Sequence, residues 1–578
     1  MLARFFLLLL LFSRIAISGI LDFTPGGTQP GLEHSLLSPT NCQSCHRLGS
    51  ESFSPFNSWS TSMMAMAGRD PLFWASLDVA NNDLPGSGDF CLKCHAPAAW
   101  LGGRIHKTST AATVNGTDGC LLQGNINERG SSHYDFEGVD CHFCHRLDPT
   151  GNNGETAKLE NANFWIDDEL CEFGGGEPCR KGPYKTSTAN HAWEYSEFLG
   201  NSGFCGTCHN VTSPALTLIN TSGVDTLIPF PIERTYKEWT LSRFGDYVFS
   251  DSHEATPDNN PSESCQSCHM PVSPDPNAYA CNADAPGTRD GELPVHELTG
   301  GNSFILEILN GEYGAQLQRT DAFITTINKT LELLQTQSAT LEVSASSNAT
   351  QINANVKITN LTGHKLPTGY PEGRRMWVNV TLQDSSLTTI WESGHWDPAS
   401  GTLANTPELK IYEALPGIFN KNGTNQCDTE DGAGNKIFHF VLNNCWVKDN
   451  RIPPEGFLGG NHLEIQPVNY SYPETSPGSG VWVNYDNTAY VIPIPVGSTG
   501  PYTVQAKLQY QTTSKDYVEF LRDQANTNNF ADDCHIRTTP SNAGIDYSQP
   551  RGNIMYDMWE AYGKSAPVNL ASDSISGL

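Results

Sequence analysis

The sequence predicts an α + β multidomain fold: a loop-rich region of short helices, then a helical connector, then an antiparallel β-sandwich. A short motif of cysteines and a histidine recurs five times in the first half of the chain, and apolar residues at helical spacing follow it. From Ala339 onward, apolar and polar residues alternate. A chain of 578 residues has room for two or more domains. We expect a signal peptide at residues 1–18, a cofactor-organised domain at 19–303, a helical connector at 304–338 and a β-sandwich domain at 339–578.

The first 18 residues have the pattern of an export signal. Arg4 precedes the apolar run from Phe5 to Phe12, and small residues at Ala16 and Ser18 form a cleavage position before Gly19. An uncleaved anchor is the less favoured alternative because the apolar run is much shorter than a bilayer span. No later stretch of the sequence is long enough to cross a membrane. We therefore expect a mature protein without an integral membrane span, located in the periplasm or outside the cell.

Five copies of the motif C-x-x-C-H dominate the first half of the chain. Motifs 1 to 5 are Cys42-Gln-Ser-Cys45-His46, Cys91-Leu-Lys-Cys94-His95, Cys141-His-Phe-Cys144-His145, Cys205-Gly-Thr-Cys208-His209 and Cys265-Gln-Ser-Cys268-His269. With 17 Cys and 17 His in the chain, chance would produce only about 0.015 such motifs. C-x-x-C-H is the attachment signature of c-type haem, in which both thiols bond to the porphyrin and the histidine binds iron.

The motifs therefore predict five covalently bound haem c groups. Zinc knuckles and thioredoxin-like redox pairs fit less well, because neither requires a histidine directly after the second cysteine. The predicted cofactor-binding residues are Cys42, Cys45, Cys91, Cys94, Cys141, Cys144, Cys205, Cys208, Cys265 and Cys268. The predicted proximal iron ligands are His46, His95, His145, His209 and His269.

A second axial ligand decides whether a haem iron carries electrons or binds substrate. His191, before motif 4, and His296, in a glycine-containing stretch after motif 5, are predicted distal ligands. Met63 or Met64 is predicted for one further haem, with the other methionine as a packing residue; thioether ligation would raise that haem's potential.

The histidines leave the remaining distal ligands open. His142, inside motif 3, points away from its own haem if the local turn is helical, so it would serve a neighbouring haem. His364 would join the two domains through iron, and a histidine in a turn is the alternative. The other candidates are His34, His106, His133 and His253.

Seven cysteines lie outside the motifs. In an oxidising compartment, the short loops from Cys171 to Cys179 and from Cys427 to Cys445 are the natural disulfide candidates. Cys534-His535 lacks a second cysteine and is not a sixth haem site.

Flanking residues resemble exported multihaem c-type cytochromes of the cytochrome c554-like superfamily with an appended C-terminal β-sandwich domain. The matching segments include Leu92-Lys-Cys-His-Ala-Pro97, Glu137-Gly-Val-Asp-Cys-His-Phe-Cys-His-Arg146, Pro231-Ile-Glu-Arg-Thr-Tyr-Lys-Glu-Trp239 and, in the second half, Gly363-His-Lys-Leu-Pro-Thr-Gly-Tyr-Pro-Glu-Gly-Arg-Arg375. The resemblance implies electron transfer. It also implies that the five motif histidines are proximal ligands and that the segments around His191 and His296 supply distal ones.

The predicted function is electron transfer through closely spaced haems, with redox proteins or further copies of this chain as partners. One alternative is a multihaem oxidoreductase of small nitrogen or sulfur compounds. It is less favoured because no C-x-x-C-K motif of the pentahaem nitrite reductases is present. Another alternative is a subunit of an extracellular cytochrome filament. Nucleic acid is excluded as a partner because the formal net charge of −29 offers no basic surface for phosphate.

Overall fold

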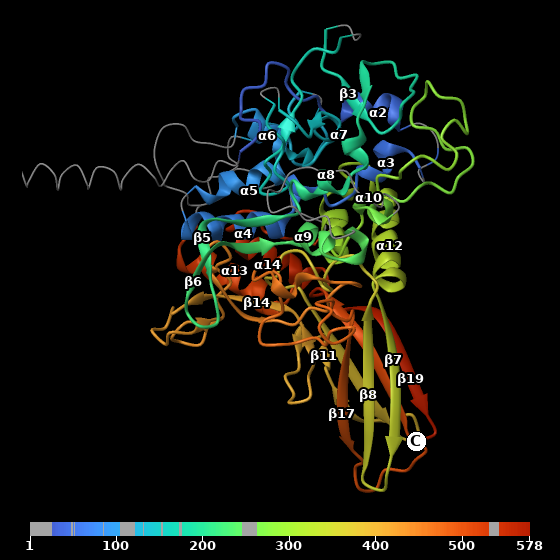
Figure 1. The fold of residues 1–578 in the computed structure, drawn as a ribbon, viewed down its shortest axis with the longest axis vertical. Helices are drawn as coiled ribbons and strands as arrows, with labels where there is room; N and C mark the ends of the chain where they lie inside the picture. The colour runs from blue at the N-terminus through green and yellow to red at the C-terminus, as the bar shows by residue number, and fades with distance from the viewer. Residues whose placement is uncertain are drawn as a thin grey trace, which may run out of the picture.

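The computed structural model describes residues 26–47, 50, 53–84, 86–104, 122–130, 132–151, 154–172, 176–245, 263–530 and 543–578. Helices and antiparallel sheets are combined within them, so the α + β fold class is confirmed. The predicted signal peptide lies outside the described residues. Figure 1 shows short helices and loops gathered at one end of the molecule and the long strands of a sandwich at the other.

Short helices and short strand pairs make up the chain before residue 303. The helices are α2 (Thr40–His46), α3 (Pro55–Trp59), α4 (Pro71–Asp83), α5 (Ser87–His95), α6 (Pro97–Leu101), α7 (Cys141–Cys144), α8 (Ser202–Gly206), α9 (Thr235–Thr240) and α10 (Cys265–His269). Short helical turns are η1 (Ala67–Arg69), η2 (Asp135–Glu137), η3 (Glu197–Gly200) and η4 (Arg243–Gly245). The strand pairs are β1 (Leu147–Asp148) with β2 (Trp165–Ile166), β3 (Arg180–Gly182) with β4 (Trp193–Tyr195) and β5 (Val211–Ile219) with β6 (Asp225–Glu233).

Four C-x-x-C pairs lie on the short helices α2, α5, α7 and α10, and in motif 4 Cys205 lies on α8 while Cys208 follows its end. Three of these helices begin at a side chain that accepts a backbone N–H group of the first turn: Asp140 for α7, Asn201 for α8 and Ser264 for α10. Helices this short are unstable alone, so such caps and the surrounding packing hold the two cysteines on one turn.

The helical spacing after residue 303 corresponds to two longer elements. α11 (Ser303–Leu309) continues through a π-helical turn, η6 (Asn310–Gly314), and α12 (Thr320–Gln337) follows. α12 leads directly into the first strand of the sandwich, as Figure 1 shows.

Two antiparallel sheets form the sandwich. One has the strand order β17-β8-β7, and the other has the order β10-β9-β18-β19, with β13 also paired to β9. Their bounds are β7 (Ala339–Ser347), β8 (Gln351–Asn360), β9 (Arg375–Gln383), β10 (Thr389–Ser393), β13 (Ile411–Tyr412), β17 (Tyr485–Pro493), β18 (Thr503–Gln511) and β19 (Val568–Ser576). Alternate residues such as Ile352, Val356, Val378 and Val504 meet in one apolar core, because side chains along a strand point to opposite faces.

The C-terminal half also contributes elements outside the sandwich, which the sequence pattern did not predict. They are α13 (Lys515–Thr527), α14 (Arg551–Ala561), β11 (Trp396–Asp397), β12 (Thr402–Leu403), β14 (Ala414–Phe419), β15 (Cys427–Asp428), β16 (Cys445–Asp449) and η7 (Gly459–Asn461). Leu72 and Val79 of α4, Ile305 of α11, Val518 of α13 and Trp559 of α14 belong to one buried core. Figure 1 shows the two late helices beside α4. The C-terminal half is therefore packed into the helical region, and the predicted domain limits stay a prediction.

Both predicted disulfides are confirmed: Cys171–Cys179 and Cys427–Cys445. Cys120 and Cys534 lie outside the described residues. No helix in the described part of the chain has both the length and the apolar character needed to cross a bilayer.

Candidate haem-binding cavity

All five motifs line one continuous cavity of about 1260 Å³. Its walls include all ten motif cysteines and all five motif histidines. His142, His191, His296, His364, Met63 and Met64 line it as well. Motifs far apart in the sequence therefore share one interior space, and most of the predicted distal ligands face that space.

The cysteine thiols give the spatial order of the motifs. Cys42 of motif 1 lies close to Cys141 of motif 3, and the interaction of the two thiols lowers the pKa of Cys42 and raises that of Cys141. Cys94 of motif 2 meets Cys208 of motif 4 in the same way. Cys205 of motif 4 also meets Cys265 of motif 5. Motif 4 thus lies next to both motif 2 and motif 5.

Motif 3 connects these two groups. Cys144 of motif 3 interacts electrostatically with both Cys205 and Cys208 of motif 4. The spatial order is therefore motif 1, motif 3, motif 4, with motifs 2 and 5 each beside motif 4.

Backbone carbonyl groups orient three of the motif histidines. Nδ1 of His46 lies 2.8 Å from the Ala280 oxygen, Nδ1 of His145 lies 2.7 Å from the Lys181 oxygen, and Nδ1 of His269 lies 2.6 Å from the Thr299 oxygen. A carbonyl can only accept, so these contacts place the imidazole proton on Nδ1 and leave the Nε2 lone pair available for a metal.

Burial keeps these imidazoles neutral, as metal binding requires. It lowers the pKa of His46 and His145, and with His364 it lowers the pKa of His269 to about 4. Burial also lowers the pKa of His95 to about 4.

His191 and His296 lie opposite two of the motif histidines. The ring centres of His46 and His191 are 6.3 Å apart, and those of His145 and His296 are 6.4 Å apart. A metal–imidazole bond is about 2.0 Å long and a ring nitrogen lies about 1.1 Å from its ring centre, so two imidazoles on opposite sides of one ion have centres about 6.3 Å apart. Both spacings match a metal ion bound between two histidines.

The same Nδ1 arrangement holds the two opposing histidines. Nδ1 of His191 lies 3.0 Å from the Ala192 oxygen, and Nδ1 of His296 lies 3.1 Å from the Pro294 oxygen. Each ring therefore directs a free Nε2 away from its own backbone.

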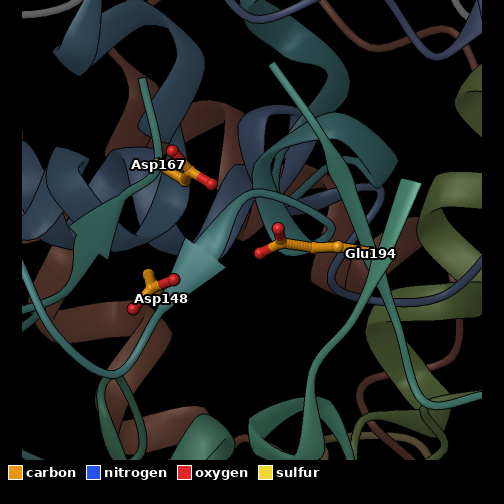
Figure 2. A group of neighbouring side chains, drawn as sticks. All are labelled: Asp148, Asp167 and Glu194. Atoms are coloured by element: carbon orange, nitrogen blue, oxygen red, sulfur yellow. The ribbon is translucent and has the colours of Figure 1, made fainter. Parts of the chain in front are cut away.

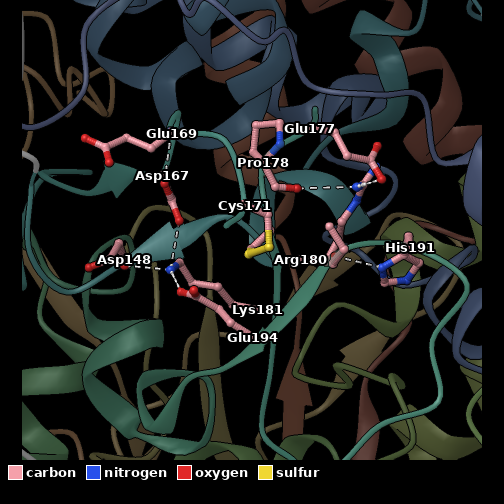
Figure 3. The surroundings of a disulfide bond; sticks show 12 residues. Asp148, Asp167, Glu169, Cys171, Glu177, Pro178, Arg180, Lys181, His191 and Glu194 are labelled. Carbon is pink, nitrogen blue, oxygen red and sulfur yellow. Dashed lines mark hydrogen bonds and ion pairs between the residues drawn. A yellow bond between two sulfur atoms is a disulfide. The ribbon is translucent and has the colours of Figure 1, made fainter. Parts of the chain in front are cut away.

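A disulfide and a lysine network fix the segment that carries His191. The Cys171–Cys179 disulfide closes just before β3, and β3 pairs in parallel with β4, which begins two residues after His191. The Lys181 N–H donates to the His145 backbone oxygen, and the Lys181 carbonyl accepts from Nδ1 of the His145 ring. Figure 3 shows the disulfide between the Lys181 side chain and His191.

The Lys181 ammonium is held by three carboxylates. Nζ lies 2.8 Å from Asp148 Oδ2 and 3.0 Å from Asp167 Oδ2, and it also contacts Glu194. Burial opposes the charge, but these carboxylates outweigh it and raise the pKa of Lys181. Figure 2 shows the three acidic side chains converging on one point, and that point is filled by the lysine. The cluster therefore needs no metal ion and serves to anchor β3.

His209 and His95 have different surroundings. Nδ1 of His209 faces a carboxylate, Glu233 Oε1, at 3.3 Å. Burial lowers the pKa of His209, but Glu233 outweighs it and raises the value to about 9. The ring of His95 stacks on Phe73 with ring centres 3.8 Å apart, and its buried Nδ1 has no hydrogen-bond partner. Among the described residues, no imidazole is paired with either ring at the spacing seen for His46 and His145.

The remaining candidate ligands differ in position. Nδ1 of His142 accepts the Leu37 N–H at 2.7 Å, which places the proton on the buried Nε2 and disfavours iron binding through that atom. Met63 and Met64 line the cavity, and Met63 also packs against the core around α4 and α11.

His133 is exposed. His34 contacts Asp168, and neither it nor His133 lines the cavity. His106 and His253 lie outside the described residues.

The sequence analysis missed Glu233 and Lys181. The available signal for Glu233 was its place among four charged residues in the segment Pro231–Trp239, because ionised side chains are buried only with a partner. Lys181 carried no comparable signal, since its role depends on three carboxylates from separate segments.

The residues of the cavity fit c-type haem. Paired thiols separated by two residues, the imidazoles of His46, His145 and His269 with free Nε2 atoms, and opposing imidazoles at metal-spanning distance are the donor set that such a group needs. His95 also lines this cavity, and its buried Nδ1 has no hydrogen-bond partner among the described residues. Residues that would hold the groups are thus present for all five motifs.

No protein-family model matches the chain, and no curated protein matches it in sequence. A solved structure similar in overall arrangement is that of a penta-heme cytochrome c552 from Thermochromatium tepidum. It has 17% sequence identity, covers 93% of this chain and 98% of that chain, and superimposes with a TM-score of 0.44. At this identity and TM-score, the likeness supports no conclusion about the function of this chain.

Proposed function

We propose that this chain is an exported pentahaem c-type cytochrome that transfers electrons through closely spaced haems in the periplasm or outside the cell. The convergence of all five C-x-x-C-H motifs on one cavity carries this proposal. Five separate pockets would isolate the irons, whereas one shared space would let the haems held by the five motifs lie close to one another. Redox proteins are the expected partners.

The thiol contacts give the conduit a branched order. A porphyrin lies beside its own two cysteines, so thiol contacts between motifs bring the corresponding haems close together. Motifs 1, 3 and 4 would hold three haems in succession, and motifs 2 and 5 would each hold a haem near that of motif 4. In this order motif 4 is the branch point.

A c-type haem, when bound, supplies one-electron exchange at iron. The chain's own residues fix each group and set its environment. Motif cysteines hold the porphyrins in order, and His191 and His296 face His46 and His145 from the opposite side. Two imidazoles leave no position for substrate, which favours electron transfer over catalysis at those two sites.

A second candidate function is oxidoreduction of a small nitrogen or sulfur compound at motif 2. Tyr370, Glu372 and Tyr517 line the cavity together with Phe73, which stacks on His95. Burial raises the pKa of Glu372 to about 7 and that of Asp70, another lining residue, to about 6. Glu372 can therefore donate a proton near neutral pH and ionised Asp70 can accept one, on the wall of the cavity that also holds motif 2, for which the described residues show no paired imidazole.

Low-temperature EPR of the oxidised, haem-loaded protein separates the two functions. Electron transfer predicts almost entirely low-spin iron, because every haem then has two strong axial ligands. A full equivalent of high-spin haem would overturn the electron-transfer assignment for that site and support the oxidoreductase.

A further inference from the structure

The loop between β8 and β9 brings His364 of the C-terminal half to the haem cavity. This loop docks on α9 and η4, the segment that precedes motif 5 in the described structure. A Cβ atom on Gly363 would lie 2.9 Å from Trp239 of α9, so only glycine permits this approach. Leu458 donates its N–H to the Leu241 oxygen at 2.8 Å, which adds a backbone bond between the two halves.

The His364 ring is oriented like the other candidate ligands. Its Nδ1 lies 3.0 Å from the Lys365 oxygen, which leaves Nε2 available. His364 and His269 both line the cavity and interact electrostatically, and they come from opposite sides of the contact between the halves.

A buried network of four charges lies directly behind His364. Lys365 Nζ contacts Asp449 Oδ2 at 2.8 Å, and Arg451 contacts the same oxygen at 2.7 Å. Arg451 also reaches Glu238 of α9 at 3.0 Å, and Glu238 Oε2 accepts the Lys365 N–H at 3.1 Å. Each charge has an opposite partner, which a buried ion requires.

The network joins the loop that carries His364 to α9 at two positions, Lys365 and Thr368. Glu238 Oε2 also accepts the Thr368 hydroxyl at 2.8 Å, four residues beyond His364. Removal of Glu238 would leave Arg451 partly unpaired and would free the Lys365 amide next to His364. The position of the His364 ring thus depends on one carboxylate of the other half.

We propose that His364 is the sixth iron ligand of the motif 5 haem and that Glu238, Arg451, Asp449 and Lys365 form the latch that positions it. This inference rests on the proposed haem content. Glu238 is a positioning residue, because it acts through Lys365 and does not reach the iron. The coordination of the motif 5 haem then depends on contact between the two halves of the chain. Motif 5 adjoins motif 4, and its Cys268 is exposed.

The ligand is tested with His364→Ala and His364→Met in the full haem-loaded chain. His364→Ala should convert one of five haems to high-spin in EPR, and added imidazole should restore the low-spin signal. His364→Met should stay low-spin, gain a near-infrared sulfur-to-iron band and raise the potential of one haem. His395→Ala, an exposed histidine in the same half, is the matched control and should change nothing.

The latch is tested with Glu238→Gln, which should give a partial high-spin signal at one haem that imidazole reverses. If Glu238→Gln does not fold, Thr368→Val is the alternative test. It removes one hydrogen bond to Glu238 and should shift the potential of the same haem. Intact mass distinguishes failure of the proposed haem content from failure of the His364 assignment. Fewer than five haems would overturn the proposed function. Five haems with an unchanged EPR spectrum in His364→Ala would show that His364 is not the ligand. An unchanged EPR spectrum in folded Glu238→Gln, or an unchanged potential in Thr368→Val, would overturn the latch.

Discussion

His46 and His191 face each other across the haem cavity with ring centres 6.3 Å apart, and no hydrogen bond holds them together. Each is fixed by a separate backbone carbonyl, Ala280 for His46 and Ala192 for His191. The spacing matches two ligands on one iron. His145 and His296 repeat it at 6.4 Å.

The first prediction concerns these opposing ligands. His191→Ala and His296→Ala, made separately, should each convert one haem to high-spin in EPR, and the double variant should convert two. His133→Ala is the control because His133 is exposed and does not line the cavity. A fully low-spin spectrum in either single variant would show that the replaced histidine is not an iron ligand.

The second prediction concerns Glu233, whose carboxylate faces Nδ1 of His209 at 3.3 Å. A carboxylate partner makes an imidazole a stronger donor and stabilises ferric iron. Glu233→Gln should therefore raise the potential of one haem by roughly 60 mV, which for one electron is a tenfold change in the reduction equilibrium. Spectropotentiometric titration measures it. An unchanged or lowered set of potentials would contradict the role of Glu233.

The third prediction concerns the Lys181 network. Lys181→Met would leave Asp148, Asp167 and Glu194 facing one another without a cation. Because the carboxylates are partly exposed, we expect the free energy of unfolding to fall by about 1–3 kcal/mol, less than for a fully buried pair. Denaturant titration checks this against Lys158→Met, which removes an exposed lysine. Equal stability of the two variants would mean that the network contributes nothing.

The fourth prediction concerns Asp70, which caps α4 through the N–H groups of Leu72 and Phe73. Burial raises its pKa from 3.8 to about 6, so between these values the folded state binds more protons than the unfolded state. Ionising Asp70 in the folded protein therefore lowers the free energy of unfolding. This loss is absent below about pH 4 and complete above about pH 6.

Asp70→Asn keeps a good capping side chain and removes the charge. It should raise the free energy of unfolding at pH 7.5 by about 1–3 kcal/mol and have little effect at pH 4. Asp70→Ala, which also loses the cap, should show a smaller gain. A stability difference between Asn and wild type that does not change with pH would contradict the raised pKa.

The sequence predicted the motifs and strands because each has a local pattern. C-x-x-C-H fits on one helical turn, and alternation fits a strand with one buried face, as in Gln351–Asn360. α13 and α14 were missed because they follow strands and pack on α4, from the opposite end of the chain. Their burial depends on tertiary contacts, which the local spacing of residues does not indicate.

Ligand pairs were harder to predict than motifs for the same reason. His191 and His296 are paired with His46 and His145, whereas spacing suggested only that they lie near motifs 4 and 5. His142 is disfavoured by a single hydrogen bond from Leu37, which depends on how a distant loop crosses motif 3. Such contacts follow from the fold and cannot be deduced from residue type.

The intact mass of the purified protein tests the central claim most directly. Five covalently attached haems should raise the mass of the chain from residue 19 onward by five haem masses, and the increase should persist under denaturing conditions because the thiol bonds do not depend on folding. A mass that fits four or fewer haems, or zinc in their place, would contradict the assignment of the five motifs.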